Sequence, residues 1–236
     1  MSAPTPTHPR IIPIADHALL VEFGEVIGDA AHDAVLQLDQ ALTRQPCQGF
    51  SEAIPAFVNL LVDFDPIVTD HAAVEAHVRR LLGSTRHVAP VPRIHEVAVC
   101  YEAPFSRDLN EVAERKRLTV EAVIAAHLSG DYQVHLYGFA PGYAYLAGTP
   151  EAIQLDRKLQ PVRDIATGSV MIAGSMCIMP TLTMQTGWWV IGRSPVKVLT
   201  GDPEKPFLFD VGDRIRFKRI SADDFAHFGA EAGGHG

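Results

Sequence analysis

Short apolar runs, and runs that alternate with a period of two, predict the strands of the first hundred residues. Residues 11–14 and 18–23 are apolar stretches of strand length separated by a polar turn. Residues 57–64 alternate between two faces, one of them strongly apolar, so a half-buried strand is expected there. A further apolar run at residues 94–100 predicts another strand.

Helical spacing of apolar residues predicts two helices between these strands. Asp29 is placed to cap the first, whose apolar face comprises Ala31, Val35, Leu38 and Leu42. The second is expected over residues 69–82, with Gly83 placed to stop it. Strand, helix, strands, helix and strand is the order of a ferredoxin-like unit, so we predict a small ferredoxin-like α+β domain over residues 11–89.

The second half of the chain has a different pattern. Two helices are predicted at residues 108–116 and 119–128, started by Asp108 and Thr119. Beyond them, short β runs are separated by Gly and Pro, which is typical of a barrel or a sandwich. The last predicted hairpin joins residues 207–209 to residues 214–217. We assign this β-rich domain to residues 93–228.

The remaining segments are predicted to lack structure of their own. Residues 1–10 have neither the basic nor the apolar region of a signal peptide and are expected to form a flexible leader. Two prolines within residues 89–92 indicate a stiff link between the domains. The tail, residues 229–236, consists mainly of Gly, Ala and His and is expected to be disordered.

Composition narrows the class of partner. The chain of 236 residues is 47% hydrophobic and 20% charged, as in ordinary globular proteins. Its formal net charge of −8 argues against a nucleic-acid partner and against an anionic membrane surface. No apolar run approaches the roughly 20 residues of a spanning helix. Three widely spaced cysteines fit a reducing cytoplasm, which is the location we expect.

A run of glycines and aromatic rings between residues 138 and 148 is the first candidate for chemistry. Glycine gives the backbone freedom to approach a ligand, while Pro141 fixes one torsion. Phe139 and Tyr145 are suited to forming the walls of a pocket. The alternative is a tight turn whose rings pack in a core.

An arginine at the end of an apolar β run is the second candidate. Residues 187–195 read GWWVIGRSP, which delivers Arg193 into a turn. A guanidinium there is able to bind a carboxylate or a phosphate through two nitrogens. Pairing with a structural aspartate such as Asp164 is the other interpretation.

Three ordered blocks resemble a known family. They are GFAPGYAYL at residues 138–146, GSVMIAG at residues 168–174, and GWWVIGRSP at residues 187–195. In order and spacing they are similar to the signature of the 5-oxoprolinase B-subunit family. That family is also known as allophanate hydrolase subunit 1 and as the kinase-inhibitor proteins, and it is one half (subdomains C and D) of a carboxyltransferase domain. AIPAFVNLLVDFDP at residues 53–66 resembles its first-domain signature. The family's second domain is a cyclophilin-like β-barrel, which the resemblance implies for this chain.

The second block departs from the family's pattern. Gly174 is retained, but Met176 stands where the family usually has a glutamine, and methionine offers no comparable donor or acceptor. Gln185, in the segment before the third block, is a candidate to supply the missing amide. This departure does not affect the predicted fold, but it weakens the inference of any particular activity from the resemblance.

His127 is the candidate acid or base. Its position near the end of a predicted helix favours a capping role toward the helix dipole. The resemblance adds that it matches a histidine found before the family's Gly-Phe-x-Pro-Gly block, which implies a functional role. The spacing of the histidines does not support a metal site, no GxSxG motif supports a nucleophilic serine, and no GxxxxGK[ST] loop supports a nucleotide site made by this chain alone.

These features lead to three hypotheses for the function. The resemblance implies one subunit of a complex that opens 5-oxoproline, or a related lactam or amide, with ATP and with a second carboxyltransferase-like subunit. In this hypothesis Arg193 binds an anionic group, His127 is acid or base, and the pocket comprises Phe139, Pro141, Gly142, Tyr145, Gly174 and Gln185. The second hypothesis is carboxyl transfer from carboxybiotin to urea or a related amide. The third is a non-enzymatic inhibitor of a sensor histidine kinase.

Overall fold

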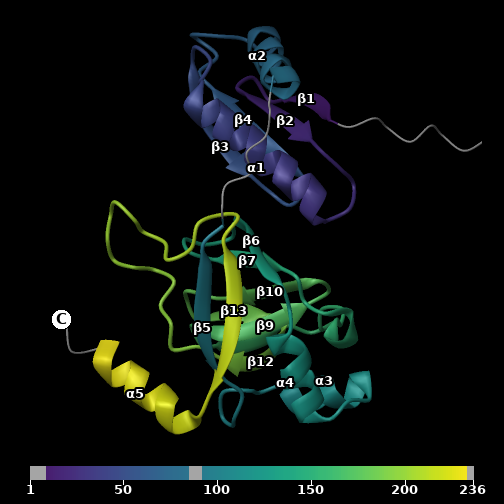
Figure 1. Ribbon diagram of the computed structural model, residues 1–236, viewed down its shortest axis with the longest axis vertical. Coiled ribbons are helices and arrows are strands. Elements are labelled where there is room, and N and C mark those ends of the chain that lie inside the picture. The colour runs from purple at the N-terminus through teal and green to yellow at the C-terminus, as the bar shows by residue number, and fades with distance from the viewer. Residues whose placement is uncertain (1–8, 85–91, 233–236) are drawn as a thin grey trace, which may run out of the picture. The chain divides into compact units, whose positions relative to one another are not determined.

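The computed structural model describes residues 9–84 and 92–232, which form two compact units (Figure 1). One lies within Met1–Val91 and the other within Pro92–Gly236. The predicted leader lies mostly outside the described residues, as do the predicted link and the last four residues of the predicted tail.

The first unit contains an antiparallel sheet of four strands in the order β1-β2-β4-β3. The strands are β1 (Arg10–Ile14), β2 (Ala18–Glu22), β3 (Phe50–Pro55) and β4 (Asn59–Phe64). Alternate residues of β2 and β4 are fully buried, as a period of two requires for a sheet covered on one face. The strand predicted at residues 57–64 is β4, which begins two residues later, at Asn59.

Two helices cover the buried face of this sheet: α1 (Asp29–Arg44) and α2 (His71–Ser84). Gly28, not the predicted Asp29, is the N-cap of α1. At α2 the Asp70 carboxylate accepts the Ala73 N–H at 2.8 Å and satisfies one of the free donors of the first turn. The helices and strands share one apolar core, whose buried members include Leu19, Leu38, Leu42, Leu60, Phe64, Val74 and Val78.

The ferredoxin-like order predicted for the first domain is not confirmed, and the assignment of its last strand is wrong. The strand β5 (Ile94–Cys100) belongs to the second unit, where it pairs with β13 and β12. At the edge of the first sheet it is β1 that pairs with β2. A short turn joins β1 to β2, and a short connection costs less loop-closure entropy than a return across the whole unit.

The second unit is built on a closed barrel of seven strands, in the order β10-β7-β6-β13-β5-β12-β9, which confirms the predicted barrel (Figure 1). Besides β5, the strands are β6 (Tyr132–Tyr137), β7 (Ala144–Ala147), β9 (Ser169–Ala173), β10 (Met176–Met179), β12 (Trp189–Arg193) and β13 (Arg214–Ile220). The chain as a whole is therefore an α+β protein, as its pattern predicted.

Helices and a small sheet surround the barrel. The helices are α3 (Leu109–Lys116), α4 (Val120–Leu128) and α5 (Ala222–Ala232), with a 3-10 turn η1 (Glu151–Ile153). The sheet pairs β8 (Val162–Ile165) with β11 (Met184–Thr186). Because α5 continues to Ala232, the expected disorder from residue 229 is not observed over 229–232.

Both predicted helix starts of this unit are confirmed, but their side chains bond differently. Thr119 caps α4 as predicted, accepting the Ala122 N–H at 3.1 Å. Asp108 is the N-cap residue of α3, as predicted, but its carboxylate makes no capping hydrogen bond. It instead accepts hydrogen bonds from the Lys158 ammonium at 2.5 Å and the Val190 N–H at 2.7 Å. Asp108 thus ties the start of α3 to β12, the strand that ends at Arg193.

The hairpin predicted between residues 207–209 and 214–217 does not form. Phe207 instead makes an isolated bridge to Leu199, and β13 runs parallel to β5. The turn between residues 207–209 and β13 is held by the buried Asp213, whose carboxylate accepts the backbone N–H groups of Arg93 and Asp210. These bonds direct β13 toward β5 rather than back along the preceding segment.

Candidate functional site

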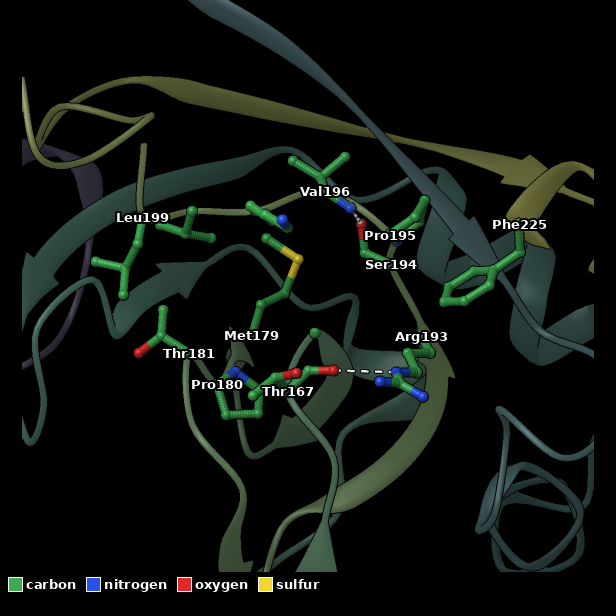
Figure 2. Close-up of a pocket in the computed structure, with 13 residues that line it drawn as sticks. Thr167, Met179, Pro180, Thr181, Arg193, Ser194, Pro195, Val196, Leu199 and Phe225 are labelled. Atoms are coloured by element: carbon green, nitrogen blue, oxygen red, sulfur yellow. Dashed lines mark hydrogen bonds between the residues drawn. The ribbon is translucent and has the colours of Figure 1, made fainter. Parts of the chain in front are cut away.

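A cavity of about 450 Å³ opens beside the barrel where β9 begins and where β10 and β12 end (Figure 2). Its lining comprises Thr167, Gly168, Met179, Pro180, Thr181, residues 193–199 and Phe225. Arg193 and Lys197 are the cationic residues of this lining, and none of the lining residues is a carboxylate. This volume lies within the range of small-molecule sites, and the charge of the wall favours an anionic ligand.

Arg193 is half-buried, and within the described residues its neighbours use only part of its hydrogen-bonding capacity. Its Nε donates to the Thr167 carbonyl at 3.0 Å, and its guanidinium carbon lies 5.8 Å from the centre of the Phe225 ring. Figure 2 shows the side chain between these two groups. Within the described residues no carboxylate pairs with it, so the predicted alternative, an ion pair with Asp164, is not observed.

The run of glycines and rings predicted as a pocket lip lies behind one wall of the cavity. The Thr181 hydroxyl donates to the Pro141 carbonyl at 2.7 Å. Gly142 has φ +71°, and a Cβ there would lie 2.8 Å from Leu199 Cδ2. Thr181 and Leu199 both line the cavity, so Pro141 and Gly142 support its wall without being exposed to its interior. A side chain at position 142 would displace Leu199.

The two predicted ring residues lie outside the lining. Phe139 is 73% exposed and has φ +70°, a strained conformation for a residue with a side chain. Tyr145 packs between Tyr143 and Trp188, with ring centres 5.4 and 6.2 Å away. Tyr145 thereby packs against the apolar cluster that contains Tyr143 and Trp188. The exposed Phe139 ring lies 5.3 Å from the ring of Tyr143.

Gly174 and Gln185 do not line the cavity. Gly174 forms the turn between β9 and β10, at the opposite end of that hairpin from the lining residues Gly168 and Pro180. A strand of four or five residues separates the two ends, or about 15 Å. Gln185 is an exposed residue of β11. The proposal that it replaces the missing amide of the second block receives no support from this placement.

His127 lies in the core of the barrel and is 0% exposed. Its Nδ1 is 2.7 Å from the Tyr101 hydroxyl, and its Nε2 is 3.7 Å from Cys177 Sγ. Burial lowers the pKa of this imidazole to about 3, so the ring is neutral near pH 7. His127 is not a lining residue of the cavity, and we do not include it in the proposed site.

Several lining residues had no signal in the sequence. Thr167 and Thr181 come from turns, Lys197 from an irregular segment, and Phe225 from α5. The segment that follows the third block was the available clue, because Lys197 stands four positions after Arg193. Nothing in the local pattern places α5 near β12.

Over residues 9–84 and 92–232 no group of three or more His, Cys, Asp or Glu side chains is arranged to hold a metal ion. Across the same residues, none of the helices combines the length and the apolar character needed to cross a membrane.

Comparison with known proteins identifies the family of this barrel protein. Residues 9–209 match the sequence model of the family "Carboxyltransferase domain, subdomain C and D". The B subunit of 5-oxoprolinase from Bacillus subtilis (strain 168) is 33% identical over 234 residues, which cover 94% of this chain and 98% of that protein. The chain therefore belongs to the carboxyltransferase subdomain C and D family, and the family predicted from the three sequence blocks is confirmed.

Solved structures agree with this assignment. A crystal structure of the protein TTHA0988 has a TM-score of 0.76 at 33% identity, covering 88% of this chain and 41% of that one. This chain thus spans about two fifths of the TTHA0988 chain. Urea carboxylase of Kluyveromyces lactis has a TM-score of 0.69 at 16% identity, covering 95% of this chain and 24% of that one. At that identity the likeness shows a common fold alone.

Proposed function

We propose that this chain is one subunit of a 5-oxoprolinase-type complex and that its cavity binds the anionic group of the substrate. The observation that carries the proposal is Arg193. Within the described residues its terminal guanidinium nitrogens make no hydrogen bond, although its Nε is fixed by Thr167. A half-buried arginine whose two terminal nitrogens are unused, in a cavity lined by no carboxylate, is suited to bind a carboxylate or a phosphate.

The chemistry of 5-oxoproline fits such a site. It is a five-membered lactam that carries a carboxylate, and the carboxylate is the group that a cationic cavity would bind. Arg193 would hold it through two parallel hydrogen bonds, which fixes the orientation of the ring. The apolar side chains of Met179, Val196 and Val198 would exclude water from the ring's carbon atoms. Our support for this particular substrate is the name of the Bacillus subtilis relative together with the charge of the cavity.

ATP is the cofactor that this proposal implies. When bound, ATP supplies a phosphoryl group that converts the lactam oxygen into a leaving group. The residues present fit a phosphate, because Arg193 and Lys197 are cationic and unopposed by acidic lining residues. They do not provide for a whole nucleotide, since the aromatic ring of this lining, Phe225, already contacts Phe105 and Arg193. The base would then be bound by another subunit.

A second carboxyltransferase-like subunit is the partner that we propose. The Bacillus subtilis relative is named as one lettered subunit of 5-oxoprolinase, which indicates that its complex contains other subunits. Neither the biotin-dependent hypothesis nor the kinase-inhibitor hypothesis is favoured by an observation on this chain, because the urea carboxylase likeness concerns the fold alone.

The decisive experiment isolates the complex from its own cells through this chain and measures 5-oxoproline-dependent ATP hydrolysis. Arg193→Ala should lower kcat/KM by about 100-fold or more, because two charge-assisted hydrogen bonds are lost. Arg163→Ala is the matched control, since Arg163 is an exposed arginine of β8 outside the cavity. Full activity of a folded Arg193→Ala complex would remove the cavity from the proposed function, and a complex without 5-oxoproline-dependent hydrolysis would overturn the proposed activity itself.

A further inference from the structure

One residue of the cavity lining comes from a helix beyond the part of the chain that the family's sequence model matches. The family match ends at residue 209, whereas Phe225 belongs to α5. The Phe225 ring lies beside the Arg193 guanidinium, at 5.8 Å (Figure 2). It also contacts the ring of Phe105, at 4.3 Å with 31° between the planes. Phe225 thereby contacts both an aromatic residue and the cation of the site.

The position of Phe225 is set by the start of α5. Ser221 and Asp224 form a reciprocal capping box, in which the Ser221 Oγ accepts the Asp224 N–H at 3.1 Å. In return the Asp224 carboxylate accepts from the Ser221 hydroxyl at 2.7 Å and lies 3.3 Å from the Ser221 N. The Phe225 N–H closes the first turn by donating to the Ser221 carbonyl at 3.0 Å. The helix therefore begins at a defined residue, and Phe225 is presented in the first turn.

Arg193 has two constraints in consequence. The Thr167 carbonyl fixes its Nε, and the Phe225 ring attracts the guanidinium toward one side. A free arginine side chain has many rotamers, and holding it in one of them before binding reduces the entropy that binding would otherwise cost. The two terminal nitrogens remain available to a ligand.

We propose that Phe225 is a positioning residue that presets Arg193 for two-nitrogen binding of an anionic ligand. This inference rests on the proposed function for its ligand, a carboxylate or a phosphate, but not for the geometry of the arginine. The contribution comes from the aromatic ring and not only from apolar volume. Replacement by another ring should preserve it, and replacement by an aliphatic side chain should not.

The first test observes Arg193 directly in the full-length chain. The Nε–H signal of Arg193 is assigned in a ¹⁵N NMR spectrum by its loss in Arg193→Lys. In Phe225→Leu this signal should shift and its hydrogen should exchange faster with water, because the ring no longer holds the guanidinium against Thr167. Phe225→Trp should keep slow exchange. Phe228→Leu is the control, since Phe228 is on the same helix but 46% exposed and outside the lining.

The second test measures binding of two probes, 5-oxoproline and inorganic phosphate, separately. Phe225→Leu should raise the Kd of the probe that binds at Arg193 by about fivefold, as expected from loss of one cation–π contact, whereas Phe225→Trp should stay within about twofold of the wild type. The probe affected identifies a carboxylate or a phosphate as the ligand. Melting temperatures of the variants show whether packing has been lost.

The outcomes separate the two proposals. If neither probe binds the wild type, or if Arg193→Ala binds both as well as the wild type does, the proposed ligand site fails, and the NMR test alone decides the role of Phe225. If the Arg193 signal is unchanged in Phe225→Leu, the positioning role is refuted. It is refuted equally if Phe225→Leu and Phe225→Trp change exchange and affinity alike, because the ring would then act only as packing.

Discussion

The interior of the barrel around His127 and the cavity around Arg193 each hold a nitrogen-containing side chain beside an aromatic ring, but they differ in burial. The centres of the His127 and Phe217 rings are 4.6 Å apart, and the Arg193 guanidinium carbon lies 5.8 Å from the centre of the Phe225 ring. His127 is fully buried, and both of its nitrogens face polar atoms of Tyr101 and Cys177. Arg193 is half-buried and has only its Nε bonded within the described residues.

This difference shows what distinguishes a structural base from a candidate for ligand binding. Burial suppresses the charge of His127, because a charged imidazole in an apolar core has lost its hydration. Arg193 has some access to solvent and, within the described residues, unused donors. Residue type and motif made both residues candidates, whereas spare hydrogen-bonding capacity and access distinguish them.

The largest effect should come from truncating the buried base. His127→Ala removes a side chain from a filled core and leaves the buried Tyr101 hydroxyl without its partner. The free energy of unfolding should fall by about 3 kcal/mol. Chemical denaturation measures this loss, and the folded variant should retain its activity in the complex. A variant of unchanged stability without activity would instead assign a catalytic role to His127 and contradict its structural role.

Arg193→Lys should have the next largest effect, and on activity rather than on stability. Lysine keeps the positive charge but cannot present two parallel donors or bond to Thr167 through Nε. We expect kcat/KM to fall about 30-fold, equivalent to about 2 kcal/mol of transition-state stabilisation. The melting temperature should stay within about 2 °C of the wild type. An equal loss of stability would show that Arg193 is structural, like His127.

The neutral state of the buried His127 should make the stability of the fold depend on pH. The pKa of His127 is about 3 when folded and about 6.5 when unfolded, so between these values the unfolded chain binds the extra proton. The stabilising contribution is complete above pH 6.5 and is lost as the pH falls toward 3, by about 1.4 kcal/mol per pH unit. His127→Gln should remove this slope in denaturation curves recorded from pH 7 to pH 5.

A second group titrates in the same range with the opposite sign. Burial raises the pKa of Asp39 to about 6, so the folded chain takes up a proton before the unfolded chain does, and acidification favours the fold there. Because Asp39 is unchanged in His127→Gln, its contribution cancels in the difference between the two curves. Identical slopes for the variant and the wild type would contradict a neutral, buried His127.

The smallest effect is expected at the second cation of the cavity. Lys197 is exposed, so its attraction for an anion is weakened by solvent and salt. Lys197→Ala should raise the KM for the anionic substrate by about twofold to fivefold, with a smaller increase at high salt. Lys205→Ala, at an exposed lysine outside the lining, should leave the KM unchanged. A loss as large as that in Arg193→Lys would make Lys197 an equal partner in binding.

Local signals in the sequence were sufficient for the helices and strands that carry a clear cap or an apolar period. Thr119 followed by an apolar run predicted the start of α4, and residues 94–100 match β5 at both ends. The three ordered blocks were sufficient for the family, because three short glycine-containing blocks in a fixed order and spacing are more specific than any one of them. In each case the deciding interactions lie within one element or its nearest neighbours along the chain.

Tertiary contacts determined the remainder. The apolar pattern of residues 94–100 predicts a strand, but it does not identify the pairing strand β13, which lies more than a hundred positions further along the chain. His127 and Arg193 could not be ranked from the sequence, since access to solvent depends on how the barrel closes. Phe225 reaches the cavity only because the capped start of α5 follows β13. Short-range propensity and periodicity specify the elements, while strand pairing, burial and the lining of a cavity depend on contacts between residues that are distant in sequence.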